Sequence, residues 1–212
     1  MKIDIISVSA ISDGAEIILT LKLSSDDGKT EKRKILLFTE QYLELGLPRG
    51  ASIGQDTFDE LERLSKKCMA IRKGSDLLSY SSSSKVRLAQ RLRQKGIDRE
   101  SAASAAEHLE TLGLINEEVD VERLVSSCLA KLWGKKRIYR ELCAKGYDKS
   151  IVSEELSKIE QDTMVANCVA LFRKKHKLFP PDPETQKKII ASLVRYGYSF
   201  DEIKRAIQMI EK

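Results

Sequence analysis

The chain has 212 residues, 42% of them hydrophobic and 6% aromatic, which is enough to bury a core in one domain or two small ones. Its net charge of +5 is uneven, because residues 1–60 carry a balance of −4, with 7 Lys and Arg against 11 Asp and Glu, and the remainder carries +9. Neither a charged leader before an apolar run nor an apolar stretch of about 18 residues occurs, which excludes a secretion signal and a membrane span and predicts a cytoplasmic protein.

Residues 1–45 alternate apolar and polar side chains with the period of a β-strand. Two Asp-Gly pairs, at Asp13-Gly14 and Asp27-Gly28, fall between the alternating runs and are typical of tight hairpin turns. The sequence therefore predicts a small three-stranded antiparallel meander with one face packed on the helices that follow. The glycine-rich and proline-containing residues 46–56 are predicted to be a linker.

The remaining chain is predicted to be helical, and one short pattern occurs in it three times. A leucine stands four residues before a glycine, an apolar residue follows the glycine, and a helix-capping residue comes next. Glycine ends a helix at low steric cost, and the Asp or Ser after it caps the next helix, so each copy predicts a tight helix–turn–helix corner. The three copies are Leu92–Asp98, Leu142–Asp148 and Leu193–Ser199.

Start and stop signals place one further helix before each corner. Thr57-x-x-Glu60 is interpreted as a capping box that starts a helix running to about Tyr80, where Ser81–Ser84 break it. The other two leading helices are expected over 118–133, up to Gly134, and from Asp162 to about Lys177. Asp182-Pro183 and Ser199-x-x-Glu202 are expected to start the last two helices.

These patterns predict a mainly α fold with three tandem three-helix repeats, forming an elongated, curved body behind the β-meander. The expected divisions are residues 1–55 for the head and linker, 56–116 for the first repeat, 117–161 for the second and 162–212 for the third.

No catalytic, metal or cofactor site is expected. Gly50–Gly54 fits G-x-S-x-G by letter, but it lacks the preceding hydrophobic strand and following helix of a nucleophile elbow. The two histidines, His108 and His176, have no convincing carboxylate or cysteine partner and are assigned to surface or packing roles. The four cysteines form no C-x-x-C pair and are interpreted as small apolar core residues: Cys68, Cys128, Cys143 and Cys168.

Basic residues recur near the same corner of each repeat and form the predicted partner-binding surface. Such a surface suits a phosphate backbone or an acidic protein groove, and the alternative is a solvated face that binds no partner. Trp133, inside the densest run, is expected to be partly buried rather than a platform for bases. The candidate residues are Lys131, Lys135, Lys136, Arg137, Arg140, Arg87, Arg91, Arg173, Lys174, Lys175, Lys188, Arg195 and Arg205.

Residues 57–212 resemble the RecX family. The resemblance is carried by the order and spacing of several segments, which are Phe58–Ser65, Ala70-Ile71, Leu77–Ser81, Lys85–Ile97, Leu109–Ile115, Trp133–Leu142, Lys145–Tyr147 and Tyr196–Ile207. The chain departs from the family pattern at Ser81–Ser84, where an Arg-Pro-Arg element is usual, at Ile115–Glu118, where an acidic Ile-Asp-Asp stretch is usual, and at Leu124-Val125, where Phe-Ala is usual. The β head lies outside the resemblance.

This resemblance implies a non-enzymatic, monomeric regulator that needs no cofactor. RecX proteins bind the groove of the RecA filament on single-stranded DNA, which lowers ATP hydrolysis, strand exchange and RecA-stimulated repressor cleavage, and so modulates DNA repair and the SOS response. Single-stranded DNA is a second candidate partner. The alternatives are a general nucleic-acid-binding helical module and a scaffold for another protein. Charge reversal at Lys135, Lys136 and Arg137 together is predicted to weaken filament binding without unfolding the protein.

Overall fold

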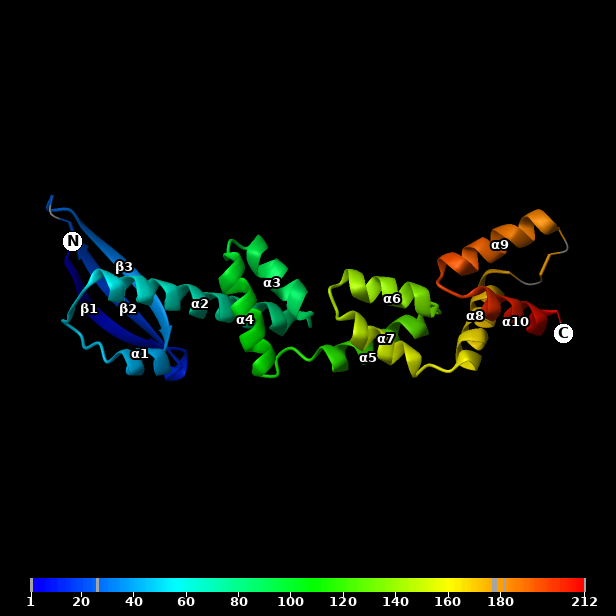
Figure 1. Ribbon diagram of the computed structural model, residues 1–212, viewed down its shortest axis with the longest axis horizontal. Coiled ribbons are helices and arrows are strands. Elements are labelled where there is room, and N and C mark those ends of the chain that lie inside the picture. Colours follow the sequence, from blue (N-terminus) through cyan, green and yellow to red (C-terminus); the bar gives the residue numbers. More distant parts are fainter. Residues whose placement is uncertain (1, 26, 177–178, 181, 212) are drawn as a thin grey trace. The chain divides into compact units, whose positions relative to one another are not determined.

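The computed structural model describes residues 2–25, 27–176, 179–180 and 182–211, and its helices and strands are shown in Figure 1. The strands are β1 (Lys2–Ile11), β2 (Glu16–Ser24), β3 (Thr30–Phe38) and β4 (Ser52–Ile53). The helices are α1 (Thr39–Leu45), α2 (Gln55–Tyr80), α3 (Lys85–Gln94), α4 (Arg99–Thr111), α5 (Glu117–Ala130), α6 (Lys135–Ala144), α7 (Lys149–Ser157), α8 (Gln161–Lys175), α9 (Pro183–Arg195) and α10 (Phe200–Ile210).

The β head is an antiparallel sheet in the order β3-β2-β1-β4. The predicted meander of β1, β2 and β3 is confirmed, and Asp13 (φ +53°) and Gly14 (φ +88°) adopt the positive φ angles expected at the first turn. The prediction of only three strands was wrong, because Ser52 and Ile53 pair with β1 as a fourth. A short helix, α1, also follows β3 directly.

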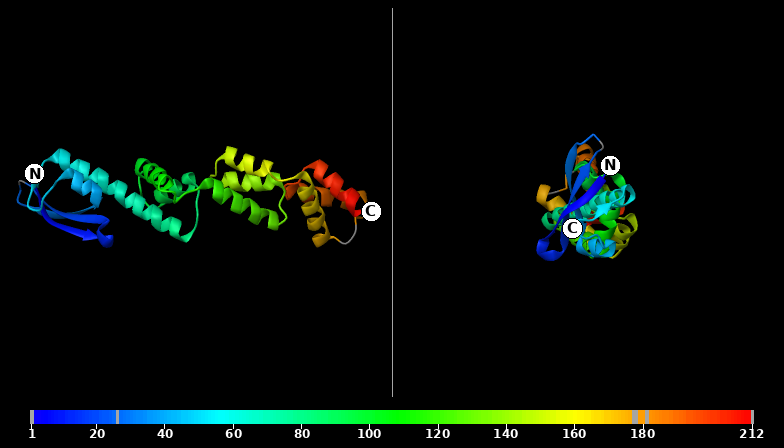
Figure 2. Two further views of the ribbon diagram at one scale, coloured as in Figure 1. Left: turned by 90° about the horizontal axis from the view of Figure 1, so that it is seen from below. Right: turned by 90° about the vertical axis from the view of Figure 1, so that its left-hand side faces the viewer.

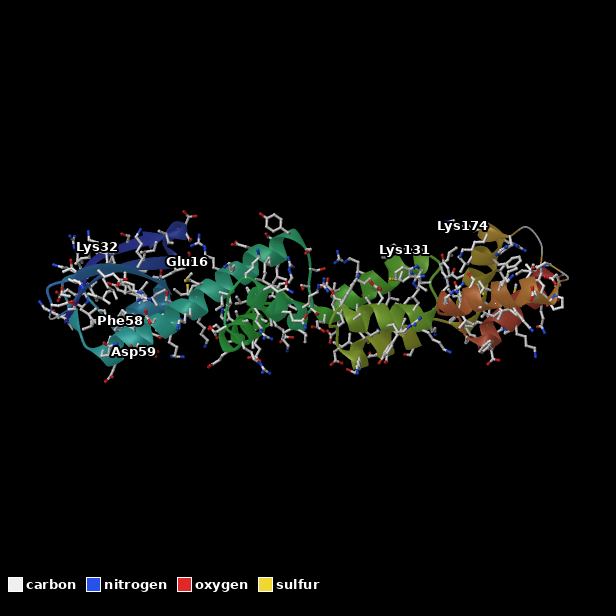
Figure 3. The ribbon with its side chains drawn as sticks, turned by 90° about the horizontal axis from the view of Figure 1, so that it is seen from above. Glu16, Lys32, Phe58, Asp59, Lys131 and Lys174 are labelled. Atoms are coloured by element: carbon white, nitrogen blue, oxygen red, sulfur yellow. The ribbon has the colours of Figure 1, made fainter. Side chains whose placement is uncertain are left out.

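One face of the sheet is covered by the first half of α2, as expected. Phe58 and Leu61 of α2 are buried among the apolar residues of β1, β2 and β3, and Figure 3 shows Phe58 between the helix and the sheet, with Lys32 on the other side of the strands. The edge strand β3 is also bound to α2, since the backbone N–H of Leu36 donates to the Ser65 hydroxyl at 3.0 Å. The head and α2 therefore share one core.

The segment between α1 and α2 was predicted to be a linker followed by a helix that starts at Thr57. The structure differs in both respects, because the segment contains a strand and the helix starts earlier. Ser52 lies in β4 and its hydroxyl donates to the Asp4 carboxylate, so it has the surroundings of a strand residue rather than of a nucleophile. The helix begins at Gln55 with Gly54 as its N-cap, so the capping box predicted at Thr57 was wrong. Pairing of Ile53 with Ile3 fixes the chain just before the helix, and the Phe58 N–H then donates to the Gly54 carbonyl.

The helical region has the three predicted three-helix repeats, which are α2–α4, α5–α7 and α8–α10. Each corner glycine has a positive φ, and the residue after it donates its N–H back to the leucine five positions earlier, at 3.1 to 3.3 Å. The predicted capping residues Asp98, Asp148 and Ser199 all accept a hydrogen bond from the first turn of the next helix. The corner prediction is confirmed at all three places.

The chain divides into two compact parts, one formed by residues 1–81 with 88–114 and the other by residues 82–87 with 115–212. The left view of Figure 2 shows the sheet and α2 of the first part in blue to cyan, and the helices α5–α10 of the second part in green to red. The boundaries expected for the head and the repeats remain a prediction. Every helix in the described chain is too short or too polar to cross a lipid bilayer.

Cysteine burial leads to a testable difference in thiol reactivity. Cys68, Cys128 and Cys168 are buried and Cys143 is half-buried, and burial raises the pKa of the Cys68 and Cys168 thiols to about 12. Because a thiolate is the reactive form, three pKa units reduce reactivity about 1,000-fold. We expect an aromatic disulfide reagent at pH 8 to modify Cys143 well before Cys68 and Cys168 in the native protein. Equal rates at all four thiols would contradict this burial.

The same pKa shifts predict a loss of stability at high pH. A raised folded-state pKa favours the neutral thiol in the native protein, so this stabilisation is complete below the unfolded pKa and is lost as the pH rises from about 9 to about 12. Urea unfolding midpoints measured across this range should fall less for a Cys68→Ala variant, whose thiol no longer titrates.

Candidate binding interface between the second and third repeats

The loop between α5 and α6 meets the corner between α9 and α10 through their backbones. The N–H of Gly134 donates to the carbonyl of Tyr196 at 2.8 Å, and the N–H of Lys136 donates to the carbonyl of Gly197 at 3.1 Å. The N-cap of α6 is Gly134, which has no side chain to cap the helix. A carbonyl of the third repeat therefore satisfies one of the free N–H groups at the start of α6.

Glycine is required on both sides of this contact. A Cβ atom on Gly134 would lie 2.3 Å from the carbonyl carbon of Gly197, and one on Gly197 would lie 2.4 Å from the nitrogen of Arg137. The loop is fixed further by Leu132, whose φ is +58° and whose carbonyl accepts a 2.9 Å hydrogen bond from the Tyr198 hydroxyl. Because of this turn α5 ends at Ala130, so the prediction that it reaches residue 133 was wrong.

Two aromatic rings and three cations form a continuous stack across the junction. The guanidinium of Arg137 lies 4.0 Å from the ring centre of Trp133 and 5.1 Å from that of Tyr196. Lys131 lies over Trp133 at 5.7 Å, and Lys175 lies over Tyr196 at 4.0 Å. Cations over aromatic faces are attracted to the negative face of the ring, and these contacts bring the basic runs of α5–α6 and α8 together.

The charge of this stack alters the phenol of Tyr196. A hydrogen bond with Lys175, followed by the positive charges of Lys175 and Arg137, lowers the Tyr196 pKa from its ordinary value. In Figure 3, the labelled Lys131 and Lys174 lie along the same edge of the view. The junction is therefore a local region of positive potential, which favours anionic groups.

A groove of about 860 Å³ lies beside the junction. Among the described residues, its lining comes from α6, α7 and α9 and contains four basic residues and no carboxylate. The ammonium of Lys135 is turned inward and donates to the carbonyl of Ile159 at 2.6 Å, whereas Lys136, Arg140 and Arg195 are exposed. The complete lining is Lys135, Lys136, Tyr139, Arg140, Ser153, Leu156, Ser157, Val194 and Arg195.

The structure brings together only part of the predicted set. The predicted residues that lie at the stack or the groove are Lys131, Lys135, Lys136, Arg137, Arg140, Lys175 and Arg195. Lys174 is close enough to the stack for its charge to lower the pKa of Tyr196. Arg205 is paired with Asp162 at 2.6 Å instead. Arg173 and Lys188 are exposed on α8 and α9, outside the described lining of the groove, and Arg87 and Arg91 lie on α3.

Sequence reasoning missed Tyr196 and the pairing of Gly134 with Gly197. One signal was present, because Gly134 directly precedes a helix that lacks a capping side chain. A helix start of this kind needs a partner from elsewhere in the fold. Trp133 was expected to be partly buried, and it is half-buried beneath the two cations that cover it.

The loop before α3 meets the corner between α6 and α7 in a similar way. Here the side chains of Ser84 and Glu117 make the hydrogen bonds, whereas Gly134 makes its contact through the backbone. The Ser84 hydroxyl donates to the carbonyl of Lys145 at 2.9 Å. The Glu117 carboxylate accepts from the N–H groups of Lys85 and Asp148, at 2.9 and 3.1 Å. Ser84 and Glu117 belong to two of the segments that depart from the family pattern, so these departures meet at one contact.

The side chains that could hold a metal ion are dispersed in the part of the chain that the structure describes. No group of three or more His, Cys, Asp or Glu side chains there is placed to hold a metal ion. His108 and His176 instead lie beside the rings of Phe38 and Phe172, at 6.5 and 5.3 Å between ring centres. The cationic stack and the groove can bind anionic groups by charge and hydrogen bonding.

Known proteins resemble this chain in sequence. Residues 162–207 match the family model described as RecX, third three-helix domain. The chain is 30% identical over 136 residues to the regulatory protein RecX of Pseudomonas fluorescens, and this alignment covers 64% of the chain and 88% of that protein. It is 24% identical over 183 residues to the regulatory protein RecX of Clostridioides difficile, covering 85% of the chain and 86% of that protein.

Solved structures agree with these relatives. A crystal structure of regulatory protein RecX superposes with a TM-score of 0.75 over 99% of this chain and 98% of that one, at 17% identity, which shows the shared fold. The crystal structure of RecX from Lactobacillus salivarius superposes with a TM-score of 0.62 at 26% identity, over 69% of this chain and 97% of that one. By its sequence relatives and its fold, the chain belongs to the RecX family of regulatory proteins.

Proposed function

We propose that this protein binds the RecA filament on single-stranded DNA and restrains the recombinase. The observation that carries the proposal is the cluster of exposed cations at the junction of the second and third repeats, beside a groove without a carboxylate. RecX relatives carry the name regulatory protein, which suits a surface that binds and does not catalyse.

The proposed action is steric and electrostatic. The protein lies in the filament groove and blocks the addition of subunits, so that ATP hydrolysis, strand exchange and repressor cleavage by RecA all decline. Several weak contacts along a repetitive filament add through effective concentration, so no single contact has to be strong. The protein acts as a monomer, without a cofactor, in the cytoplasm where RecA works, and thereby modulates DNA repair and the SOS response.

The test is the DNA-dependent ATP hydrolysis of RecA on a long single-stranded DNA. Adding this protein below the concentration of RecA should lower the steady rate, because each bound molecule affects several subunits. The control is heat-denatured protein at the same concentration. An unchanged rate at saturating native protein would rule out the proposed function.

A general nucleic-acid-binding module is the second candidate, and its support is the basic surface itself. Binding to phosphates predicts comparable, strongly salt-dependent affinity for DNA without RecA. Cations of the protein itself already lie over the rings of Trp133 and Tyr196, and they compete with bases for stacking on these rings. Lack of binding to an oligodeoxythymidylate at low salt would remove this candidate.

A further inference from the structure

The groove between α6, α7 and α9 combines an apolar floor with a cationic rim. Leu156, Tyr139 and Val194 line the groove and form its apolar floor, where the half-buried Tyr139 and Val194 are more open to water than the buried Leu156. The exposed cations Lys136 and Arg140 stand beside them on α6. Arg195 adds a third exposed cation from α9.

This combination distinguishes between two kinds of anionic partner. A phosphate backbone satisfies the cations but has no apolar group to place on Leu156 and Val194. A protein segment offers both, because a single apolar side chain can fill the floor while neighbouring carboxylates reach the rim. The aromatic ring in the groove is a poor base-stacking platform, since Tyr139 is half-buried and its hydroxyl interacts with Cys143 and Ser153.

We propose that this groove binds an acidic segment of a protein partner, which inserts one apolar side chain between Leu156 and Val194 and places carboxylates at Lys136, Arg140 and Arg195. The inference rests on the proposed function, because it names the chemistry by which this surface recognises its filament partner. Lys135 contributes less to the rim, since its ammonium already donates to Ile159.

The direct test uses a dye-labelled synthetic peptide with one leucine between two short runs of aspartate and glutamate. Two other probes are the same peptide with serine in place of leucine, and an oligodeoxythymidylate. The leucine peptide should bind about 20-fold more tightly than the serine peptide in fluorescence anisotropy, because only leucine buries apolar surface. Equal binding of the two peptides, or preferential binding of the oligonucleotide, would overturn the inference.

A matched pair of variants places the binding in the groove. Ser157 is exposed and lines the groove, whereas Glu154 is exposed on the same helix outside it. Ser157→Phe should fill the floor and weaken binding of the leucine peptide at least about tenfold, while Glu154→Phe leaves it unchanged. The emission of Trp133, the only tryptophan, should be the same in both variants if the junction stays folded.

The RecA assay separates this inference from the proposed function. If the native protein suppresses ATP hydrolysis and Ser157→Phe suppresses it equally well, the function stands and the groove inference is overturned. If Ser157→Phe loses suppression and Glu154→Phe retains it, both are supported. If the native protein does not suppress hydrolysis, the proposed function fails, and the peptide measurements alone decide what the groove binds.

Discussion

Gly134→Ala is expected to lower the free energy of unfolding by about 3 kcal/mol, the upper part of the range for overpacked sites. The added methyl group would lie 2.3 Å from a backbone atom of Gly197, and backbone atoms cannot rotate away as a side chain can. The two repeats would have to separate locally, which breaks the hydrogen bonds from Gly134 to Tyr196 and from Lys136 to Gly197. Urea denaturation followed by the emission of Trp133 measures the effect.

Two other glycines provide graded controls. A Cβ atom on Gly54 meets nothing within 4 Å at an ordinary φ of −80°, so Gly54→Ala should change stability by less than about 1 kcal/mol. A Cβ atom on Gly74 would clash with the end of the Leu109 side chain, at 2.5 Å, which can move, and would make ordinary contacts with Leu88 and Leu92. Its alanine variant should fall between the other two. A Gly134→Ala protein as stable as the native one would refute the close backbone contact.

Simultaneous charge reversal at Lys136, Arg140 and Arg195 is expected to weaken binding to RecA filaments about 30-fold at roughly 0.1 M salt. Exposed ion pairs contribute about 0.2–1 kcal/mol each, and a total of about 2 kcal/mol corresponds to this change in Kd. These three cations are exposed at the groove, so the triple Glu variant should retain the native unfolding midpoint. Anisotropy of dye-labelled filaments measures the affinity.

This set replaces the reversal of Lys135, Lys136 and Arg137 suggested by the sequence. Lys135 donates to Ile159, and Arg137 lies over two aromatic rings, so acidic residues there would disturb packing as well as charge. A control with the same change in net charge is Glu at Lys22, Lys32 and Lys34, which are exposed on the sheet. Equal weakening by both triple variants would mean that total charge, and not the groove, governs binding.

The helical corners could be predicted because their causes are local. A glycine with positive φ, a leucine four residues before it and a capping side chain two residues after it all lie within seven consecutive residues. The same reasoning failed for β4, because Ser52 and Ile53 become a strand only by pairing with β1, nearly 50 residues away in sequence. It also misplaced the start of α2, which depends on that pairing.

The candidate site could be predicted in composition and not in arrangement. The basic residues were visible in the sequence, but their grouping depends on which corner contacts which loop. Arg137 meets Lys175 only through the ring of Tyr196, and that arrangement follows from the contact between Gly134 and Gly197. Arg205 shows the converse, because its charge is neutralised by Asp162 from another helix of the same repeat.

The backbone hydrogen bonds that the second repeat donates to the third also set an order for folding during translation. The last helix of the second repeat, α7, ends at Ser157, yet the start of α6 receives its backbone partners from Tyr196 and Gly197. A ribosome must therefore synthesise some 40 further residues, and expose them beyond its exit tunnel, before this helix can form its last contacts. A nascent chain arrested before that point would carry a frayed α6 and an unassembled cationic stack.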